Sequence, residues 1–263
     1  MNPSLMGVVN VTPDSFSDGG RFLDPDAAIA HGLELVEQGA DILDVGGEST
    51  RPGAEEVSAE EERARVEPVV RGLAAAGHTV SIDTSKPAVA EAALDAGASI
   101  VNDVTALRGD PGIGGLCAER GAGLVLMHMR GDPRTMQEEP RYEDVVGEVK
   151  AFLAERLEVA VGAGVAAERI WLDPGIGFGK TLEHNLELLR RLGELRELGR
   201  PLVVGTSRKS FIGKLDGSEV GDRIGGTIAS SVLAAAEGAA VLRVHDVAAM
   251  ADALKVADAI LDG

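Results

Sequence analysis

Short apolar runs alternate with longer amphipathic segments along the whole chain. Within the longer segments, apolar side chains recur at steps of three and four, which is typical of a helix with one buried face. The last segment carries Val247, Met250, Leu254, Ala257 and Leu261 at this spacing. The apolar runs predict strands at residues 5–10, 42–45, 80–82, 100–101, 124–127, 169–172, 202–204 and 241–244.

Helices are predicted between these strands. Asp24-Pro25 and Asp110-Pro111 are typical helix starts, because proline is tolerated in the first turn and a preceding aspartate caps it. The predicted helices cover about residues 24–36, 59–76, 85–96, 110–120, 142–161, 182–189, 222–237 and 247–261. Residues 11–22 and 46–58 are left as two long loops, and loops of that length are uncommon unless they bind or cover a ligand.

The order of elements predicts an α/β fold. Short, fully apolar strands are what a parallel sheet buried on both faces requires. Eight strand–helix units in 263 residues favour a (β/α)8 TIM barrel, which usually has about 250 residues. The alternative is an open doubly wound sheet, but that fold more often carries a glycine fingerprint after its first strand. Because no linker rich in Pro or Ser interrupts the chain, we expect a single domain, residues 1–263.

Composition excludes several classes of protein. The formal net charge of −18 argues against nucleic acid and anionic membranes as partners, so an anionic substrate must meet a local basic cluster. No apolar run is long enough to span a membrane, and no signal-peptide pattern begins the sequence, so we expect a cytoplasmic protein. A lone cysteine, Cys117, rules out an internal disulfide and is expected to be a buried structural thiol.

The stretch W-L-D-P-G-I-G-F-G-K-T at residues 171–181 resembles a nucleotide loop but does not fit one. A Walker loop ending at Lys180 needs its first glycine where Pro174 lies, and a dinucleotide fingerprint needs a glycine at Lys180. What remains is Asp173 at the end of a strand, beside a glycine-rich turn. Whether Lys180 is a surface or a binding residue stays open.

Almost every predicted strand ends on a hydrogen-bonding group, and in this barrel the active site lies at the C-terminal ends of the strands. Polar residues also mark where strands stop, but two of only four asparagines fall there. Asp83, Asn102 and Asp173 suit a heterocycle that bears several N–H donors and a carbonyl. A metal cluster is disfavoured because no histidine spacing accompanies these carboxylates, and magnesium would more readily arrive with a phosphate.

Basic residues form a second group, from the second loop and the last two strands. Loops after strands seven and eight are a frequent phosphate site in this fold, although any one of these residues alone could have a solvated or capping role. The group is Arg51, Arg208, Lys209, Arg243 and His245. By contrast, Lys86 is expected at the surface of a helix N-terminus, and His31, His78 and His184 are expected at surface positions.

Eight motifs, in order along the chain, resemble those of the dihydropteroate synthase family. They are N-V-T-P-D-S-F-S-D-G-G (10–20), V-G-G-E-S-T-R-P-G (45–53), D-T-S-K-P (83–87), N-D (102–103), L-M-H-M-R-G (126–131), D-P-G-I-G-F-G-K (173–180), S-R-K-S (207–210) and R-V-H-D (243–246). The resemblance implies a transferase that joins 6-hydroxymethyl-7,8-dihydropterin diphosphate to 4-aminobenzoate. The implied products are 7,8-dihydropteroate and diphosphate.

The resemblance also implies roles for particular residues. The pterin would be held by Asp83, Asn102, Asp173, Lys209, Arg243 and Phe178. The diphosphate would be held by Asn10, Thr50, Arg51 and His245, with Mg²⁺ contacting Asn10 and the phosphates. The 4-aminobenzoate, whose site also takes sulfonamides in this family, would be bordered by Phe16, Thr50, Pro52, Lys209 and Ser210. The reaction itself would depend on Asp83, Lys209, Arg51 and His245.

The residues agree with a substitution that needs charge stabilisation more than a nucleophile. No Ser-His-Asp or Cys-His arrangement is evident. Diphosphate leaves readily once Mg²⁺, Arg51 and His245 neutralise its charge, and Asp83 can stabilise the cation left on the pterin methylene. The long loops would exclude water from this SN1-like reaction.

Two other functions stay open. A methyltransferase acting between methyltetrahydrofolate and a corrinoid would share the barrel and the pterin carboxylates, but would not need loops 10–20 and 47–53. A non-catalytic pterin-binding paralogue would be expected to have lost loop residues. The family resemblance further suggests a homodimer formed through helices of the second half.

Overall fold

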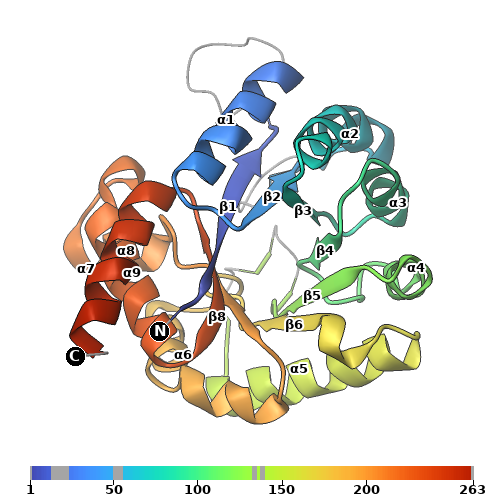
Figure 1. Cartoon of the computed structure of the whole chain (residues 1–263). Coiled ribbons are helices and arrows are strands. Elements are labelled where there is room, and N and C mark those ends of the chain that lie inside the picture. Colours follow the sequence, from blue (N-terminus) through green and yellow to red (C-terminus); the bar gives the residue numbers. More distant parts are fainter. Residues whose placement is uncertain (1, 13–23, 50–55, 132–134, 137–139, 262–263) are drawn as a thin grey trace.

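The computed structural model describes residues 2–12, 24–49, 56–131, 135–136 and 140–261. Its eight parallel strands close into a barrel in sequence order, with β8 paired to β1 (Figure 1). This confirms the predicted TIM barrel, and the open-sheet alternative is wrong. The strands are β1 (Ser4–Asn10), β2 (Ile42–Gly46), β3 (Thr79–Asp83), β4 (Ile100–Asp103), β5 (Gly123–Met127), β6 (Ile170–Asp173), β7 (Leu202–Val204) and β8 (Ala239–Val244).

Helices surround the barrel on its outside (Figure 1). They are α1 (Pro25–Glu37), α2 (Ala59–Ala75), α3 (Pro87–Asp95), α4 (Gly112–Arg120), α5 (Val145–Gly162), α6 (Leu182–Arg190), α7 (Ser210–Asp216), α8 (Ile224–Ala236) and α9 (Val247–Leu261). Short 3-10 helices are η1 (Ala167–Arg169), η2 (Leu192–Leu198) and η3 (Val220–Asp222). The predicted start at Asp24-Pro25 is confirmed, since the Asp24 side chain accepts from the Asp26 amide.

Helix α7 is the element that the sequence did not predict. It has seven residues, too few to show a clear helical period, and it contains a glycine. Phe211 and Ile212 are buried by it, and Gly217 ends it in the left-handed conformation, with φ of 77°. Ser210, which the family resemblance places beside 4-aminobenzoate, is the first residue of this helix.

An apolar layer fills the barrel below the strand ends. Met6, Ile100, Val125, Val203 and Val241 are buried together in one cluster, against which Ile42 and Trp171 pack. Because a barrel of this size is filled by side chains, this layer closes the interior from below.

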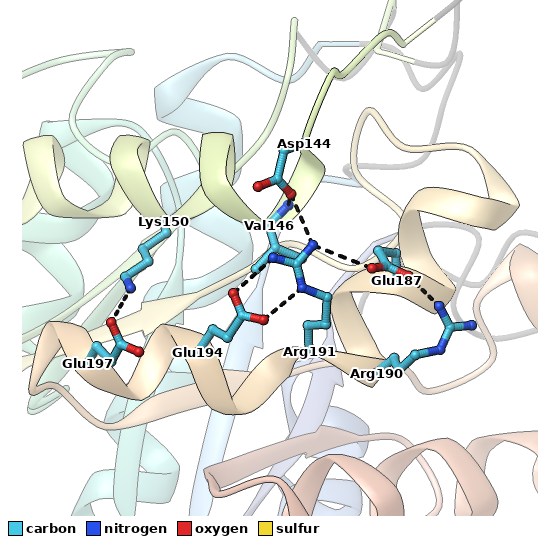
Figure 2. Close-up of polar contacts among 8 residues, drawn as sticks. All are labelled: Asp144, Val146, Lys150, Glu187, Arg190, Arg191, Glu194 and Glu197. Atoms are coloured by element: carbon cyan, nitrogen blue, oxygen red, sulfur yellow. Dashed lines mark hydrogen bonds and ion pairs between the residues drawn. The ribbon is translucent and has the colours of Figure 1, made fainter.

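A network of exposed charges joins α5, α6 and η2 on the outer surface (Figure 2). The Arg191 guanidinium donates to Glu194 at 2.7 and 2.9 Å and to Asp144 at 3.1 Å. Lys150 on α5 separately donates to Glu197 at 2.5 Å. Water screens such exposed pairs, so they contribute little to stability.

The only cysteine, Cys117, is buried in α4, as predicted. Burial raises the pKa of its thiol to about 12. Because the thiolate is the reactive form, we expect a disulfide reagent at about pH 8 to leave the native protein unmodified. The same reagent should titrate one thiol after unfolding in guanidinium chloride. Equal reaction rates before and after unfolding would contradict the buried position.

No helix in the described residues is both long and apolar enough to cross a membrane.

Candidate active site

The register of the barrel brings the predicted strand-end residues to one level. Asn10 pairs with Gly46, Gly46 with Asp83, and Asp83 with Asn102. A Cβ on Gly46 would lie 3.9 Å from Asn10 Oδ1 and 3.8 Å from Asp83 Oδ2, so both side chains flank this glycine. On the other side of the barrel, Asp173 pairs with Met127. The register therefore places Asn10, Asp83 and Asn102 next to one another at the C-terminal ends of their strands.

Arg243 enters this cluster from β8. Its Nη2 donates to Asp83 Oδ2 at 2.8 Å and its Nε donates to Asp44 Oδ2 at 2.6 Å. Although burial alone would lower the pKa of Arg243, the carboxylates of Asp44 and Asp83 raise it, so the guanidinium stays charged. Arg243 is thus held in place before any substrate binds.

Asp44 is the residue of this site that sequence analysis missed. It lies in the middle of β2 and is fully buried. Its Oδ2 accepts both from Arg243 and, at 3.1 Å, from Asn102 Nδ2. A carboxylate inside the apolar run I-L-D-V could have been noticed, since a buried charge requires a partner. Asp44 therefore links two of the predicted pterin residues.

Burial raises the pKa values of the two strand-end carboxyl groups, Asp83 and Asp173. It raises the pKa of Asp83, against the opposing effect of the Arg243 guanidinium. Burial also raises the pKa of Asp173, against a hydrogen bond of 2.6 Å from the Gly175 amide to its Oδ1. Both carboxyl groups therefore lie where the local dielectric is low, and there a hydrogen bond to a ligand is stronger than in water.

Lys209 faces the aromatic ring of Phe178. Its Nζ lies 3.9 Å from the ring centroid, which is a cation–π contact. Burial, and next the charge of Arg243, lower the pKa of Lys209 to about 8. Phe178 also packs against the buried side chains of Met127 and Met129. The two methionines thus lie on the side of Phe178.

His128 and Lys180 contact each other, and Lys180 also contacts backbone carbonyls of the turn after β6. Lys180 is 2% exposed, and its Nζ donates to Gly175 O at 2.9 Å, Phe178 O at 3.0 Å and His128 Nδ1 at 2.9 Å. Burial, and then the charge of Lys180, lower the pKa of His128 to about 2, so this histidine is neutral. Lys180 is therefore neither a surface residue nor a substrate ligand, and it organises the turn after β6.

Glycine is required where the loops after β5 and β6 meet. Gly175 has φ of 66°, and a Cβ there would lie 1.9 Å from the carbonyl oxygen of His128. Gly179 has φ of 62°, and its Cβ would lie 2.5 Å from the carbonyl oxygen of Arg130. The glycines of the 171–181 stretch thus allow two backbones to pack together.

The basic group after β7 and β8 is divided. His245 Nδ1 lies 2.9 Å from the Ser207 hydroxyl, and burial followed by the charge of Arg243 lowers the pKa of His245 to about 3. Arg208 donates twice to Asp246, at 3.0 and 2.6 Å, and is therefore occupied by an ion pair. Lys209 and Arg243 face the barrel, whereas Arg208 does not join them.

Several predicted residues are not brought into contact. Ser210 is exposed at the start of α7. Phe16, Thr50, Arg51 and Pro52 lie outside the described residues. In the described part of the chain, no group of three His, Cys, Asp or Glu side chains is placed to hold a metal ion.

Comparison with known proteins identifies the family of the chain. The model of the pterin binding enzyme family matches residues 6–245. The chain is 50% identical over 262 residues to a dihydropteroate synthase of Neisseria meningitidis serogroup C, covering 98% of this chain and 93% of the relative. Xanthomonas albilineans dihydropteroate synthase with 4-aminobenzoic acid is 51% identical, with a TM-score of 0.93 and coverage of 99% and 94%. The Xanthomonas albilineans synthase in complex with 7,8-dihydropteroate is 48% identical, with a TM-score of 0.90 and the same coverage. The chain therefore belongs to the dihydropteroate synthase family of pterin-binding transferases.

Proposed function

We propose that the protein joins 6-hydroxymethyl-7,8-dihydropterin diphosphate to 4-aminobenzoate, forming 7,8-dihydropteroate and releasing diphosphate. The observation that carries this proposal is the hydrogen-bonded cluster at the strand ends, in which half-buried Asp83 and Arg243 meet buried Asp44 and Asn102. The related Xanthomonas albilineans structures, one with 4-aminobenzoic acid and one with 7,8-dihydropteroate, support the second substrate and the product. The whole of residues 1–263 would act as one domain.

The pterin would bind across the strand ends. Asp83 and Asp173 would accept hydrogen bonds from ring N–H and amino groups, and Asn102 would both donate and accept. Lys209 would donate to the ring, with Phe178 beside its ammonium and Arg243 stacked on the pterin face. Asn102 and Asp173 are buried and Asp83 and Lys209 are half-buried, so water competes little for their hydrogen bonds with the ligand.

The diphosphate would lie at the rim near Asn10 and His245, with Thr50 and Arg51 from the second loop. The Ser207 hydroxyl accepts from the His245 backbone amide at 3.2 Å, so its own proton can go to Nδ1 of the same residue. His245 then carries its proton on Nε2 and donates it to the anion. This arrangement lets a neutral histidine bind diphosphate.

Mg²⁺ fits this rim as a shared ligand of protein and substrate. Asn10 Oδ1 is a hard oxygen donor, and phosphate oxygens would complete the coordination, as magnesium prefers. When bound, the ion would neutralise charge on the leaving diphosphate. The residues of this chain would do the rest, since Asp83 stabilises the positive charge that develops on the pterin methylene and Lys209 orients the ring.

The 4-aminobenzoate would approach between Lys209, Ser210 and the two long loops. Phe16, Thr50 and Pro52 would border it. A sulfonamide, which shares the arylamine, would compete for the same place. The corrinoid methyltransferase alternative does not account for the rim around Asn10 and His245, and we set it aside.

We also propose that two copies of the chain associate through α7, α8 and α9, which lie side by side in Figure 1. Large apolar side chains on these helices are exposed, and such a patch marks an interaction surface more often than a free face. They are Leu215, Ile224, Leu233, Val256, Ile260 and Leu261. The cytoplasmic location stays a prediction from the sequence.

The proposed function is tested by diphosphate release from the pterin diphosphate with Mg²⁺, with and without 4-aminobenzoate. We expect release that depends on the arylamine and yields 7,8-dihydropteroate in equal amount. Pterin binding without product would instead identify a binding paralogue. No pterin binding at all would mean that the strand-end carboxylates have another role.

A further inference from the structure

Lys86 joins two carboxylates behind the second long loop, residues 46–58. Its expected place at the surface is wrong, since its side chain is 21% exposed and its Nζ donates to Glu62 Oε2 at 2.5 Å and to Glu48 Oε2 at 2.9 Å. Glu62, on α2, is fully buried. Burial alone would lower the pKa of Lys86, but the hydrogen bonds to Glu62 and Glu48 raise it, so the ammonium is charged.

The same cluster holds both ends of this loop. Glu48 lies two residues after the end of β2, and Val57 lies two residues before the start of α2. The Val57 amide donates to Glu48 Oε1 at 2.9 Å, and the Val57 carbonyl accepts from Lys86 Nζ at 2.7 Å. Lys86 lies in the turn after β3, whose last residue is Asp83. The cluster thus ties the two ends of the loop to each other and to the strand that carries Asp83.

The start of the loop has no room to shift. A Cβ on Gly47 would lie 2.7 Å from Val66 Cγ1 and 3.0 Å from Glu62 Cγ. The Gly47 carbonyl also accepts from Arg65 Nη1 at 2.8 Å. The backbone before Glu48 is therefore pressed against α2.

Stability alone does not account for such a cluster. The free energy needed to remove two charges from water offsets much of the free energy gained from their attraction. Apolar side chains of equal volume often stabilise a protein interior equally well. Glu62 Oε1, moreover, has no hydrogen-bond partner within the described part of the chain, which is a further cost. Charge-assisted hydrogen bonds do, however, fix the direction of the groups that they join.

We propose that Glu48, Glu62 and Lys86 form a positioning clamp, which holds the ends of the second loop at a fixed separation and thereby serves the binding of diphosphate and 4-aminobenzoate. The inference rests on the proposed function, because Thr50, Arg51 and Pro52 lie between the clamped ends. The clamp residues are positioning residues and do not touch a substrate. Among the described residues, the side-chain hydrogen bonds of Asp83, Asn102 and Asp173 do not involve a clamp residue.

Lys86→Met removes the charge and keeps most of the side-chain volume. We expect the KM for 4-aminobenzoate to rise at least about tenfold, because small displacements of a binding group have large effects. Affinity for inorganic diphosphate, measured by calorimetry, should fall to a similar extent. Affinity for 6-hydroxymethylpterin, which carries no diphosphate, should change by less than about twofold. Lys86→Arg should recover much of the loss.

A double variant separates positioning from stability. Glu62→Met with Lys86→Met replaces the Lys86–Glu62 pair by apolar groups and leaves Glu48, which is 23% exposed, in contact with water, so its Tm should stay close to that of the wild type. Its KM for 4-aminobenzoate should nevertheless stay raised, and a KM that recovers with the Tm would reduce the cluster to a structural role. Lys150→Met is the matched control, since it removes the exposed ion pair between Lys150 on α5 and Glu197 on η2 (Figure 2). This control should change neither the Tm nor the KM for 4-aminobenzoate.

Hydrogen exchange of the Val57 amide tests the clamp without reference to activity. This amide is bonded to Glu48 and should be protected in the wild type. In Lys86→Met its exchange should be at least about tenfold faster. Equal protection in both proteins would overturn the clamp. A protected amide in a wild-type protein that makes no dihydropteroate would refute the proposed function and leave the clamp standing.

Discussion

Asp83→Ala is expected to lower kcat by about two to three orders of magnitude, while the affinity for pterin falls by about tenfold or less. The reason is that Asp83 is already paired with Arg243 in the free protein, at 2.8 Å, so substrate gains little from it at first. As the diphosphate leaves, positive charge develops on the pterin methylene, and the carboxylate then interacts with it much more strongly. Single-turnover kinetics and calorimetry measure the two effects separately.

Asp83→Asn is the sharper variant, because it keeps the size and one acceptor oxygen but removes the charge. We expect nearly wild-type pterin affinity and a kcat reduced about a hundredfold. Arg243 keeps its bond of 2.6 Å to Asp44 in this variant, so the site should not collapse. Equal losses of affinity and kcat would make Asp83 a plain binding residue.

The dependence on pH has a definite sign. Burial raises the pKa of Asp83, with Arg243 opposing that rise. Lowering the pH through this pKa protonates the wild-type carboxylate and makes it neutral, as the amide of Asp83→Asn is at every pH. The ratio of the wild-type kcat to the Asp83→Asn kcat should therefore shrink as the pH falls. A constant ratio would show that the charge is not used.

Asp44→Ala is expected to destabilise the protein by about 3–5 kcal/mol and to weaken pterin binding strongly in the molecules that remain folded. Asp44 is fully buried and accepts from both Arg243 and Asn102. Its removal leaves a buried guanidinium with one partner and frees an amide that must face the pterin. Urea unfolding and pterin calorimetry give the two results.

Asp103→Ala is the control for this experiment. Asp103 is also fully buried, but it accepts hydrogen bonds from the Thr105 amide at 2.8 Å and from the Leu107 amide at 2.7 Å. Asp103 therefore holds a turn after β4. Its loss should lower stability, whereas the folded fraction should bind pterin as the wild type does. Pterin affinity that survives in Asp44→Ala as it does in Asp103→Ala would contradict a positioning role for Asp44.

Much of the fold could be predicted because each cue is local. Apolar runs and helical periods depend on residues close in sequence, and the strand and helix positions agree with the structure within a few residues at most boundaries. Helix α7 was missed, since seven residues with an internal glycine carry almost no period. The strand-end residues Asp83, Asn102 and Asp173 could be named because the barrel places every such end on one face.

The charges of the site could not be assigned in the same way. The sequence left open whether Lys180 is a surface or a binding residue, and the structure shows its ammonium bonded to the backbone carbonyls of Gly175 and Phe178. Arg208 and Lys209 are neighbours, but Arg208 turns to Asp246. Lys86 was expected at the surface, although it is held by Glu48 and Glu62. Each outcome depends on partners far away in the chain.

By itself, the sequence determined the alternation of strands and helices, the barrel and the set of polar residues at its upper rim, because these follow from periodicity and from the parallel order of strands. Only the tertiary structure decided that Asp44 links Arg243 to Asn102 and that Lys86 clamps the second loop. The physical reason is that a buried charge is defined by the groups that replace its water. Those groups come from other strands and helices, and only the folded chain brings them within hydrogen-bonding distance.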